Sequence, residues 1–177
     1  MTHAIWKCDC GSVEATLPTD GMRLVCYCES CRGFVERLGS GDRLNAAGGN
    51  DLLQVAPDQV EIRGAEHLRW MKMTEKGPTR WYTACCSTPM ANTLGTRKVP
   101  FASFQVHDIR PAEAVPAIDA HVNLKGALAR VEEPLGSMRA VIFSFISRVL
   151  SAWVTGRWRR NPFFTQDGKP IAERQDP

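Results

Sequence analysis

The stretch CYCESC at residues 26–31 brings three cysteines into six residues, where an apolar strand pattern gives way to a helix. Cys26 and Cys28 share one face of an extended chain, because side chains alternate along a strand. Cys31 returns on the first helical turn, and a helix N-terminus favours thiolate over thiol. We expect these three residues, the cysteine trio, to bind one zinc ion. Three protein ligands leave the fourth tetrahedral position for water or substrate, as in a catalytic site.

Two further clusters hold the other four cysteines. In CDCG at residues 8–11, two thiolates one residue apart can bind one ion if the chain turns sharply, and Gly11 permits such a turn. The second cluster is CCSTP at residues 85–89. Together they could form a four-thiolate site that ties the first strand to a late one and contributes folding free energy on the order of 10 kcal/mol. The expected ligands of this site are Cys8, Cys10, Cys85 and Cys86.

The cysteine content indicates metal binding more than disulfide bonding. Residues 4–14 contain Lys7, Asp9 and two cysteines and lack the apolar run of a signal peptide, so we expect a cytoplasmic protein. Thiols persist in that reducing compartment, and seven cysteines cannot all pair within one chain. With 177 residues, 44% of them hydrophobic, the chain can build a core without disulfides. Its net charge of +3 is too small to indicate a nucleic-acid partner.

Two other interpretations of the cysteines compete with metal binding. A single cysteine is often a small buried hydrophobe, but here all seven lie in three tight clusters. Cys28 and Cys31 also form a C-x-x-C pair, which is typical of redox dithiols. That interpretation leaves Cys8, Cys10 and Cys26 unexplained, and the sequence shows no thioredoxin-like βαβ pattern. We therefore favour one or two bound zinc ions.

Short strands separated by glycine and proline predict a mainly β fold, with a small antiparallel zinc-binding domain over residues 1–110. In SVEATL (12–17), apolar and polar residues alternate, which is typical of a half-buried strand. A short helix is expected over residues 30–38, with Ser30 as its N-cap. The turn signal EKGP (75–78) predicts a hairpin between the strands that flank it. The expected strands are residues 3–8, 12–17, 23–28, 52–56, 60–63, 68–74, 80–84 and 100–107.

Residues 111–177 are expected to form a C-terminal extension. Residues 136–160 contain apolar residues at helical spacing, which predicts one long helix. Arg139 and Arg148 interrupt the apolar run, so we do not expect the helix to span a membrane. We favour packing of the helix on the sheet, and the alternative is binding to a membrane surface or a partner. The tail from Thr165 is expected to be loose.

The order of the three clusters resembles the glutathione-dependent formaldehyde-activating enzyme family, which also includes the centromere protein V domain. The resemblance covers residues 3–107 and is carried by CDCG (8–11) and CYCESCR (26–32). It implies a zinc-bound fold of the β-tent type. It also implies a structural zinc on the first and late cysteine pairs and a second, catalytic zinc on the trio. We expect a divergent branch of this superfamily.

The late motif TACCSTP (83–89) departs from the C-x-x-C-G of that family. Thr83 stands at the first family cysteine, Cys86 aligns with the second, and Ser87 replaces the glycine. In an extended chain Cys85 and Cys86 would point to opposite faces, whereas a turn would let both bind one ion. Alternatively, Cys85 could face the trio and close that site.

The resemblance implies a zinc-dependent carbon–sulfur lyase that adds glutathione to formaldehyde or reverses such an addition. Zinc in an open trio site could depress the pKa of a small thiol and present its thiolate to a carbonyl carbon. Three thiolates leave that site with a formal charge of about −1, which a cationic neighbour would offset while attracting anionic glutathione. Arg32, next to Cys31, is the best-placed candidate. The other candidate cations are Arg23, Arg37, Lys72, Arg80 and Arg97.

Two residues could move protons, and one competing function stays open. His107 is a candidate general base, and Glu29 could relay a proton beside the trio. The competing function is a noncatalytic zinc module whose Arg-rich C-terminal helix binds a partner. A closed four-thiolate shell at the trio, or no cleft beside it, would favour this alternative.

Overall fold

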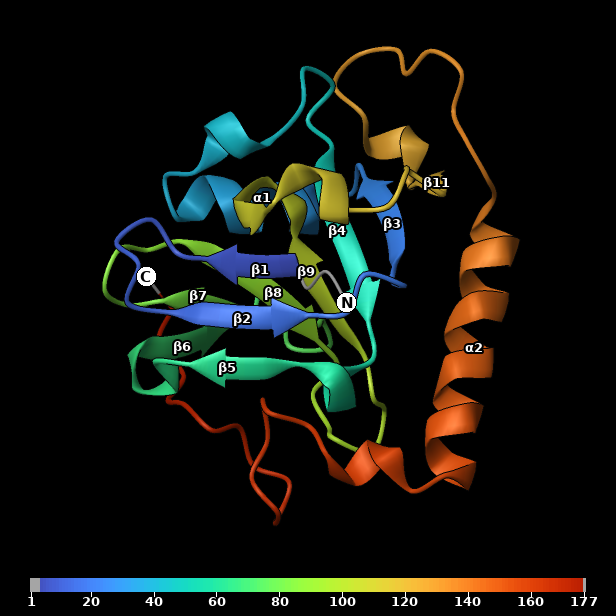
Figure 1. Ribbon diagram of the computed structural model, residues 1–177. Coiled ribbons are helices and arrows are strands. Elements are labelled where there is room, and N and C mark those ends of the chain that lie inside the picture. The colour runs from blue at the N-terminus through green and yellow to red at the C-terminus, as the bar shows by residue number, and fades with distance from the viewer. Residues whose placement is uncertain (1–3, 177) are drawn as a thin grey trace.

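A four-stranded antiparallel sheet forms one layer of the molecule, in the strand order β10-β1-β2-β5 (Figure 1). The computed structural model describes residues 4–176, so the start of the strand predicted at residues 3–8 lies outside this range. Along the first strand Ala4 and Trp6 are buried while Ile5 is exposed, the alternation of a strand with one covered face. The strands are β1 (Ala4–Lys7), β2 (Glu14–Leu17), β5 (Glu61–Arg63) and β10 (Ile109–Arg110).

A seven-stranded sheet forms the second layer, in the order β11-β3-β4-β9-β8-β7-β6. Neighbouring strands run antiparallel except β11 and β3, which are parallel. The hairpin predicted around residues 75–78 is confirmed, because β6 and β7 pair antiparallel with Trp70 opposite Trp81. The strands are β3 (Met22–Cys26), β4 (Asn50–Val55), β6 (Leu68–Met71), β7 (Thr79–Thr83), β8 (Pro89–Thr93), β9 (Ala102–Gln105) and β11 (Ala120–Val122).

The main hydrophobic core combines side chains of both sheets. Trp6 of β1 belongs to the same buried cluster as Leu53, Trp81 and Phe104 of the larger sheet. Phe163, from the C-terminal region, enters this cluster with its ring centroid 5.0 Å from that of Trp81. Residues on both sides of position 110 therefore share one core, and the predicted domain division between residues 1–110 and 111–177 stays a prediction.

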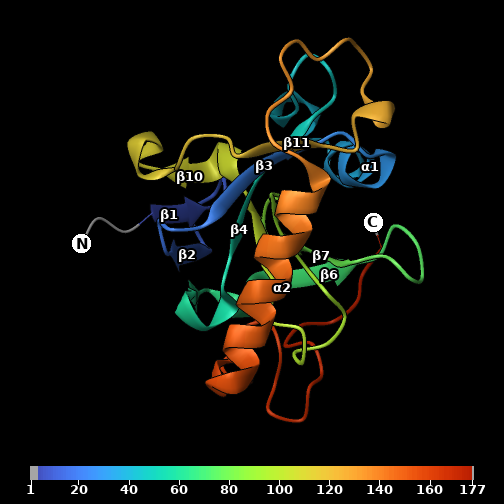
Figure 2. The same cartoon turned by 90° about the vertical axis from the view of Figure 1, so that its right-hand side faces the viewer.

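Two α-helices complete the described fold, α1 (Glu29–Arg37) and α2 (Met138–Val154). The first packs Phe34 against Met71 and Tyr82, on the face of the larger sheet that lies opposite the main core. Figure 2 shows α2 running in front of the larger sheet, with its outer side toward the viewer. The prediction of a mainly β fold with a C-terminal helix is thus confirmed. Within residues 4–176, no helix combines the length and the apolar character needed to cross a bilayer.

Two strands of the larger sheet were not predicted, and the C-terminal helix is shorter than predicted. β8 begins with Pro89, and proline in a sequence argues against a central strand except at its first residue. β11 has three residues, too few to show an alternating pattern. The helix predicted over residues 136–160 ends at Val154, because Gly156 adopts a left-handed conformation with φ 72°.

The C-terminal tail follows strand β6, which differs from the loose segment predicted from Thr165. The backbone N–H of Trp70 donates to the carbonyl of Glu173 at 3.3 Å, and that of Gln175 donates to the carbonyl of Trp70 at 2.9 Å. The hydroxyl of Tyr82 donates to the carbonyl of Gln175 at 3.0 Å. Because β6 is an edge strand, its free backbone groups provide these partners, which the sequence of the tail does not reveal.

Candidate metal centres

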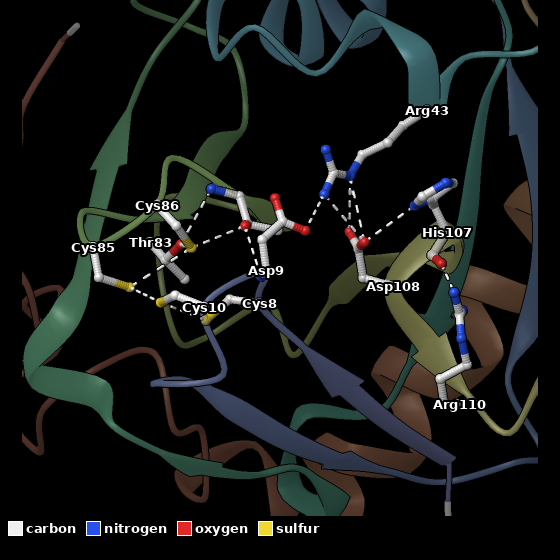
Figure 3. A network of polar contacts seen from close by, with 11 residues as sticks. Cys8, Asp9, Cys10, Arg43, Thr83, Cys85, Cys86, His107, Asp108 and Arg110 are labelled. Atoms are coloured by element: carbon white, nitrogen blue, oxygen red, sulfur yellow. Dashed lines mark hydrogen bonds and ion pairs between the residues drawn. The ribbon is translucent and has the colours of Figure 1, made fainter.

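Four cysteines from two distant turns come together beside the sheets, as Figure 3 shows. Cys8 and Cys10 lie between β1 and β2, whereas Cys85 and Cys86 lie between β7 and β8. Their four Sγ atoms are all within 4.8 Å of one another. We call these residues the four-cysteine group. The structure therefore brings together the early and late pairs that the sequence predicts as one site.

The spacing of the sulfur atoms in this group fits one metal ion. Cys10 Sγ lies 3.6 Å from Cys8 Sγ and 3.2 Å from Cys85 Sγ, and the Sγ atoms of Cys85 and Cys86 are 3.8 Å apart. Four thiolates held tetrahedrally about 2.3 Å from an ion would be about 3.8 Å apart, whereas disulfide-bonded sulfurs are about 2.05 Å apart. All seven cysteines are free. The group can therefore hold a metal ion.

A turn at residues 84–86 lets the two adjacent cysteines share this site. The turn is closed by the N–H of Ser87, which donates to the carbonyl of Thr83 at 2.8 Å. Ser87 has φ 56°, the left-handed conformation for which glycine is better suited, and it is the residue that replaces the glycine of the resembled family. Because the turn aims Cys85 at the four-cysteine group, Cys85 does not close the trio.

Hydrogen-bonding groups surround the four sulfurs. The backbone N–H of Val13 donates to Cys8 Sγ at 3.2 Å, and burial raises the pKa of the Cys8 thiol. Cys86 Sγ lies 3.3 Å from the hydroxyl of Thr83 and 3.1 Å from that of Thr88. Thr83, which stands at a cysteine position of the resembled family, is therefore a hydrogen-bonding neighbour of the group. Such contacts orient thiolates and stabilise their charge.

A charged network adjoins the four-cysteine group (Figure 3). Asp9 of the first cluster accepts a hydrogen bond of 2.6 Å from Arg43, which also pairs with Asp108 at 3.1 Å. His107 Nδ1 lies 3.1 Å from a carboxylate oxygen of Asp108. The structure therefore places His107, the predicted candidate general base, in this network and not among the residues beside the trio.

The cysteine trio lies where β3 ends and α1 begins. The Sγ atoms of Cys26, Cys28 and Cys31 are within 4.8 Å of one another, and those of Cys26 and Cys28 are 3.4 Å apart. Cys28 is the N-cap of α1, and its Sγ accepts a hydrogen bond from the N–H of Cys31 at 3.4 Å. Strand alternation followed by one helical turn thus brings the three sulfurs together. This group, too, can hold a metal ion.

The three thiols of the trio differ in acidity. Hydrogen bonds from Cys26 and Cys31 lower the pKa of Cys28 to about 2. The hydrogen bond with Cys28 raises the pKa of Cys26, whereas hydrogen bonds with Cys26 and Cys28, together with burial, raise the pKa of Cys31 well above its usual value. One thiolate shared among three sulfurs is therefore the preferred state, and a bound metal ion must displace the remaining protons.

Arg80 of β7 is the cation that lies against the trio. Its Nη1 and Nη2 atoms are 3.5 and 3.6 Å from Cys31 Sγ, and the residue is 2% exposed. The guanidinium also donates to Asn92 Oδ1 at 2.8 Å and to Ser30 Oγ at 2.9 Å. Because arginine keeps its charge even when buried, it favours thiolate in its neighbours.

Arg32, the cation predicted to be best placed, points away from the trio. Its Nη1 donates to the carbonyl of Gly126 at 2.9 Å, and its Nε lies 3.9 Å from a carboxylate oxygen of Glu36. The reason is helical geometry, since each residue is turned by about 100° from the one before it. Another predicted cation, Arg23, is paired with Asp51 at 2.7 Å.

A pocket of 370 Å³ opens beside the trio. All three trio cysteines contribute to its lining, and so do Arg80 and Ser103. Two buried atoms of this lining, Arg80 Nε and Ser103 Oγ, have no hydrogen-bond partner within residues 4–176. Buried polar atoms are nearly always paired, so these two indicate where a ligand could bind. The apolar part of the lining comprises Leu24, Leu52, Leu94, Phe101, Val122, Met138 and Val141.

Asn123 is a neighbour of the trio that the sequence did not indicate. Its Nδ2 donates to Cys26 Sγ at 3.2 Å. The contact depends on the parallel pairing of β11 with β3, which sets Val122 opposite Cys26 and for which there is no local sequence signal. Glu29, the predicted proton relay, lies exposed on the first turn of α1.

Comparisons with known proteins identify the family. A crystal structure of a Rhodobacter sphaeroides protein, a structural genomics target, is similar over 60% of this chain and 88% of that protein. The two share 20% sequence identity, with a TM-score of 0.42. No curated protein matches the sequence. The family described as "Family of unknown function (DUF6151)" matches residues 2–175, nearly the whole chain. This chain therefore belongs to the DUF6151 family.

Proposed function

We propose that this protein binds two zinc ions and catalyses the reversible addition of a small thiol to a carbonyl compound. In this proposal the four-cysteine group holds a structural zinc and the trio holds a reactive one. The protein would then be a divergent relative of the glutathione-dependent formaldehyde-activating enzymes and a carbon–sulfur lyase. The observation that carries the proposal is the pocket that opens beside three converging sulfurs and a buried guanidinium.

The donor atoms support zinc as the metal. Both groups consist of cysteine sulfur alone. Soft thiolate ligands select zinc, copper(I) or iron–sulfur clusters over magnesium and calcium, which prefer oxygen. A closed four-thiolate set is typical of structural zinc, and three protein ligands are typical of catalytic zinc. The two groups therefore suit two different tasks in one chain.

A zinc ion held at the trio would supply a position at which a small thiol loses its proton readily. Four features of the chain support chemistry there. Arg80 offsets the negative charge of the thiolates, and Asn123 fixes the orientation of Cys26 through its hydrogen bond. Apolar side chains line much of the pocket beside the reacting groups, as in most small-molecule sites. The Ser103 hydroxyl, which has no partner among the described residues 4–176, offers a hydrogen bond to a carbonyl oxygen.

The proposed net reaction needs no oxidant or reductant. The thiol sulfur forms a bond to the carbonyl carbon, and the proton of the thiol ends on the carbonyl oxygen. The product is a hydroxyalkyl thioether, and the reverse reaction breaks the same carbon–sulfur bond. Glutathione is the thiol implied by the family resemblance, whereas the apolar wall also suits a less polar small thiol.

Elemental analysis tests the two metal sites. We expect two equivalents of zinc in the wild-type protein and one equivalent in each of the variants Cys28→Ser and Cys86→Ser. A single equivalent in the wild-type protein would contradict the two-site proposal. Retention of two equivalents by Cys28→Ser would show that the trio is not a ligand set.

Cobalt substitution tests whether the trio site is open. In the cobalt-loaded protein, glutathione or 2-phenylethanethiol should change the visible absorption spectrum, because a new thiolate enters the coordination shell. The Cys28→Ser variant, which keeps the four-cysteine group, should show no such change. Magnetisation-transfer NMR on mixtures of thiol and formaldehyde then measures catalysis, which should be present in the zinc-loaded wild type and lost in Cys28→Ser.

A noncatalytic zinc module is the second candidate function. The exposure of Phe143, Leu150 and Val154 on α2 favours it, because a partner could cover these apolar side chains. In that case both ions would support the fold, and the helix would bind a partner. Two zinc equivalents with a cobalt spectrum insensitive to both thiols would select this alternative.

A further inference from the structure

The outer face of α2 is apolar and exposed. Phe143, Leu150 and Val154 keep 76%, 60% and 88% of their surface accessible. A helix that merely packs on a globular domain carries polar residues on the side that faces solvent. Here the solvent side is at least as apolar as the side that packs. The other exposed large apolar residues of α2 are Met138, Ile142, Ile146 and Trp153.

The segment before the helix also exposes large apolar residues. Leu128 and Leu135 are exposed as well, at 66% and 49%. They precede α2 in the long connection that follows β11, which Figure 1 shows at the same end of the molecule as the start of the helix. We call these two leucines and the exposed apolar residues of α2 the apolar face. The exposed apolar residues of α2 recur at helical spacing, and an exposed apolar stripe of this kind marks a binding site in a folded protein.

Positive charge accompanies the apolar face. Residues 134–166 contain five arginines and neither aspartate nor glutamate. Arg139 near the start of α2 and Arg159 and Arg160 after its end are exposed. An apolar stripe bordered by arginines is typical of helices that lie in the interface of an anionic membrane.

A pair of tryptophans stands at the C-terminal end of the face. The rings of Trp153 and Trp158 stack with centroids 5.6 Å apart. The guanidinium carbons of Arg97 and Arg159 lie 5.4 and 4.9 Å from the centre of the Trp158 ring. Tryptophan with adjacent arginine is enriched where a membrane meets water, because the ring is amphipathic and the cation reaches the head groups.

We propose that this protein docks on the surface of an anionic lipid bilayer through the apolar face, with α2 lying parallel to the membrane plane. The positive charge beside the apolar face favours an anionic bilayer over a second copy of this chain as the partner. Two α2 helices packed against each other would bring arginines toward arginines in either direction. The nearest acidic residues in sequence, Glu132, Glu133 and Asp167, lie outside residues 134–166. An anionic bilayer supplies both the apolar layer and the negative charge. This proposal does not depend on the function of the metal centres.

Vesicle co-sedimentation of the full-length, zinc-loaded chain tests the proposal. We expect binding to vesicles of equal parts phosphatidylcholine and phosphatidylserine, weakening as salt is added, and little binding to phosphatidylcholine alone. The affinity of the double variant Phe143→Ser/Leu150→Ser for these vesicles should be lower by a factor of about ten or more. The matched control Ile5→Ser removes an exposed apolar residue of β1 and should bind as the wild type does.

Charge variants and fluorescence give independent readouts. Arg159→Glu/Arg160→Glu should weaken binding to the anionic vesicles, whereas Arg37→Glu, an exposed charge on α1, should not. Lipids brominated in their acyl chains should quench tryptophan fluorescence in the wild type, and Trp153→Phe should reduce this quenching. Unchanged zinc content and unfolding temperature will show that each variant is folded.

Three results would overturn the proposal. The first is no binding to anionic vesicles by the folded wild-type protein. The second is equal binding by the wild type and Phe143→Ser/Leu150→Ser. The third is a dimer in sedimentation equilibrium that Phe143→Ser/Leu150→Ser dissociates, because the apolar face would then be covered by a second copy of this chain.

Discussion

Arg80 Nη1 lies 3.5 Å from Cys31 Sγ, and the two residues are only 2% and 7% exposed. A fixed cation therefore contacts a buried sulfur of the trio. Solvent screens this attraction little, so it is stronger than the same contact on a surface. The arrangement favours thiolate over thiol in the trio, and it makes Arg80 a positioning residue for a metal ion bound there.

The substitution Arg80→Met should weaken zinc binding at the trio about 10–100-fold, the range found for partners of metal ligands. It removes the charge while keeping a long side chain. Competition with a chromophoric chelator measures the effect, and the four-cysteine group should keep its affinity. Arg69→Met, on neighbouring strand β6, is the control, since that guanidinium donates to the carbonyls of Glu66 and Leu68. Equal loss of zinc at both sites in Arg80→Met would contradict this role.

Loss of the four-cysteine ion should destabilise the fold far more than loss of the trio ion. An ion in the four-cysteine group would join two turns far apart in sequence, whereas an ion in the trio would join residues of one short segment. Urea unfolding of Cys86→Ser in the presence of zinc should therefore show a loss of several kcal/mol, and that of Cys28→Ser a smaller one. A strong chelator should reproduce the larger loss in the wild type. A greater loss in Cys28→Ser than in Cys86→Ser would reverse the assignment of the structural site.

Ser87→Gly should stabilise the zinc-loaded protein by about 0.5–1 kcal/mol. The φ of 56° at this position is unfavourable for a residue with a side chain, and glycine relieves the strain at some cost in unfolded-state entropy. Ser87→Val should be destabilising, because a β-branched side chain tolerates this conformation least. Thermal unfolding of the two variants beside the wild type measures both effects. Stabilisation by valine would show that the turn does not hold this φ in solution.

Zinc binding at the trio should release about two protons near neutral pH, because Cys28 is already ionised whereas the pKa values of Cys26 and Cys31 are raised. As pH falls, protons compete with zinc for the thiolates of Cys26 and Cys31, so the affinity of the trio for zinc falls. Calorimetry in buffers of different ionisation enthalpy counts the protons, and the difference between wild type and Cys28→Ser isolates the trio. Release of three protons would mean that Cys28 is protonated before the metal binds.

Phe163→Ala should cost about 3–5 kcal/mol, the usual range for a buried phenylalanine. The Phe163 ring is fully buried, and its centroid lies 5.0 Å from that of Trp81 and 5.9 Å from that of Phe104. Phe143→Ala makes the same chemical change at a site that is 76% exposed, so it should alter stability by about 0.5 kcal/mol or less. Chemical unfolding compares the two. Similar effects at both sites would argue against a role for the C-terminal region in the main core.

Local features of the fold and the trio could be predicted from the sequence. The spacing of Cys26, Cys28 and Cys31 is short enough that strand alternation and one helical turn decide where the sulfurs point. The same locality explains the confirmed hairpin around residues 75–78. For the four-cysteine group the clusters were visible, but the placement of Cys85 depended on the turn that ends β7, and the sequence left its conformation open.

Features that depend on distant pairing could not be predicted. Arg80 reaches the trio because β7 presents alternate residues to opposite faces of the sheet, and Asn123 reaches it because β11 runs beside β3. No short stretch of sequence contains either relationship. The helical pattern of α2 was visible, yet periodicity alone could not tell which of its apolar residues would stay exposed.

Cys10 and Cys85 are separated by 75 positions, although their sulfurs are 3.2 Å apart. An ion bound by both would make the folding of each newly made chain depend on the supply of metal. Closing so long a loop costs conformational entropy before contacts between the distant strands can stabilise the closed state. This cost slows the folding of sheet proteins. An ion captured by both turns would complete that closure early. Chains synthesised during zinc shortage should therefore remain longer with uncovered strand edges, where aggregation begins. Starvation for the metal should then appear as insoluble or degraded protein, before any deficit in a reaction could be measured.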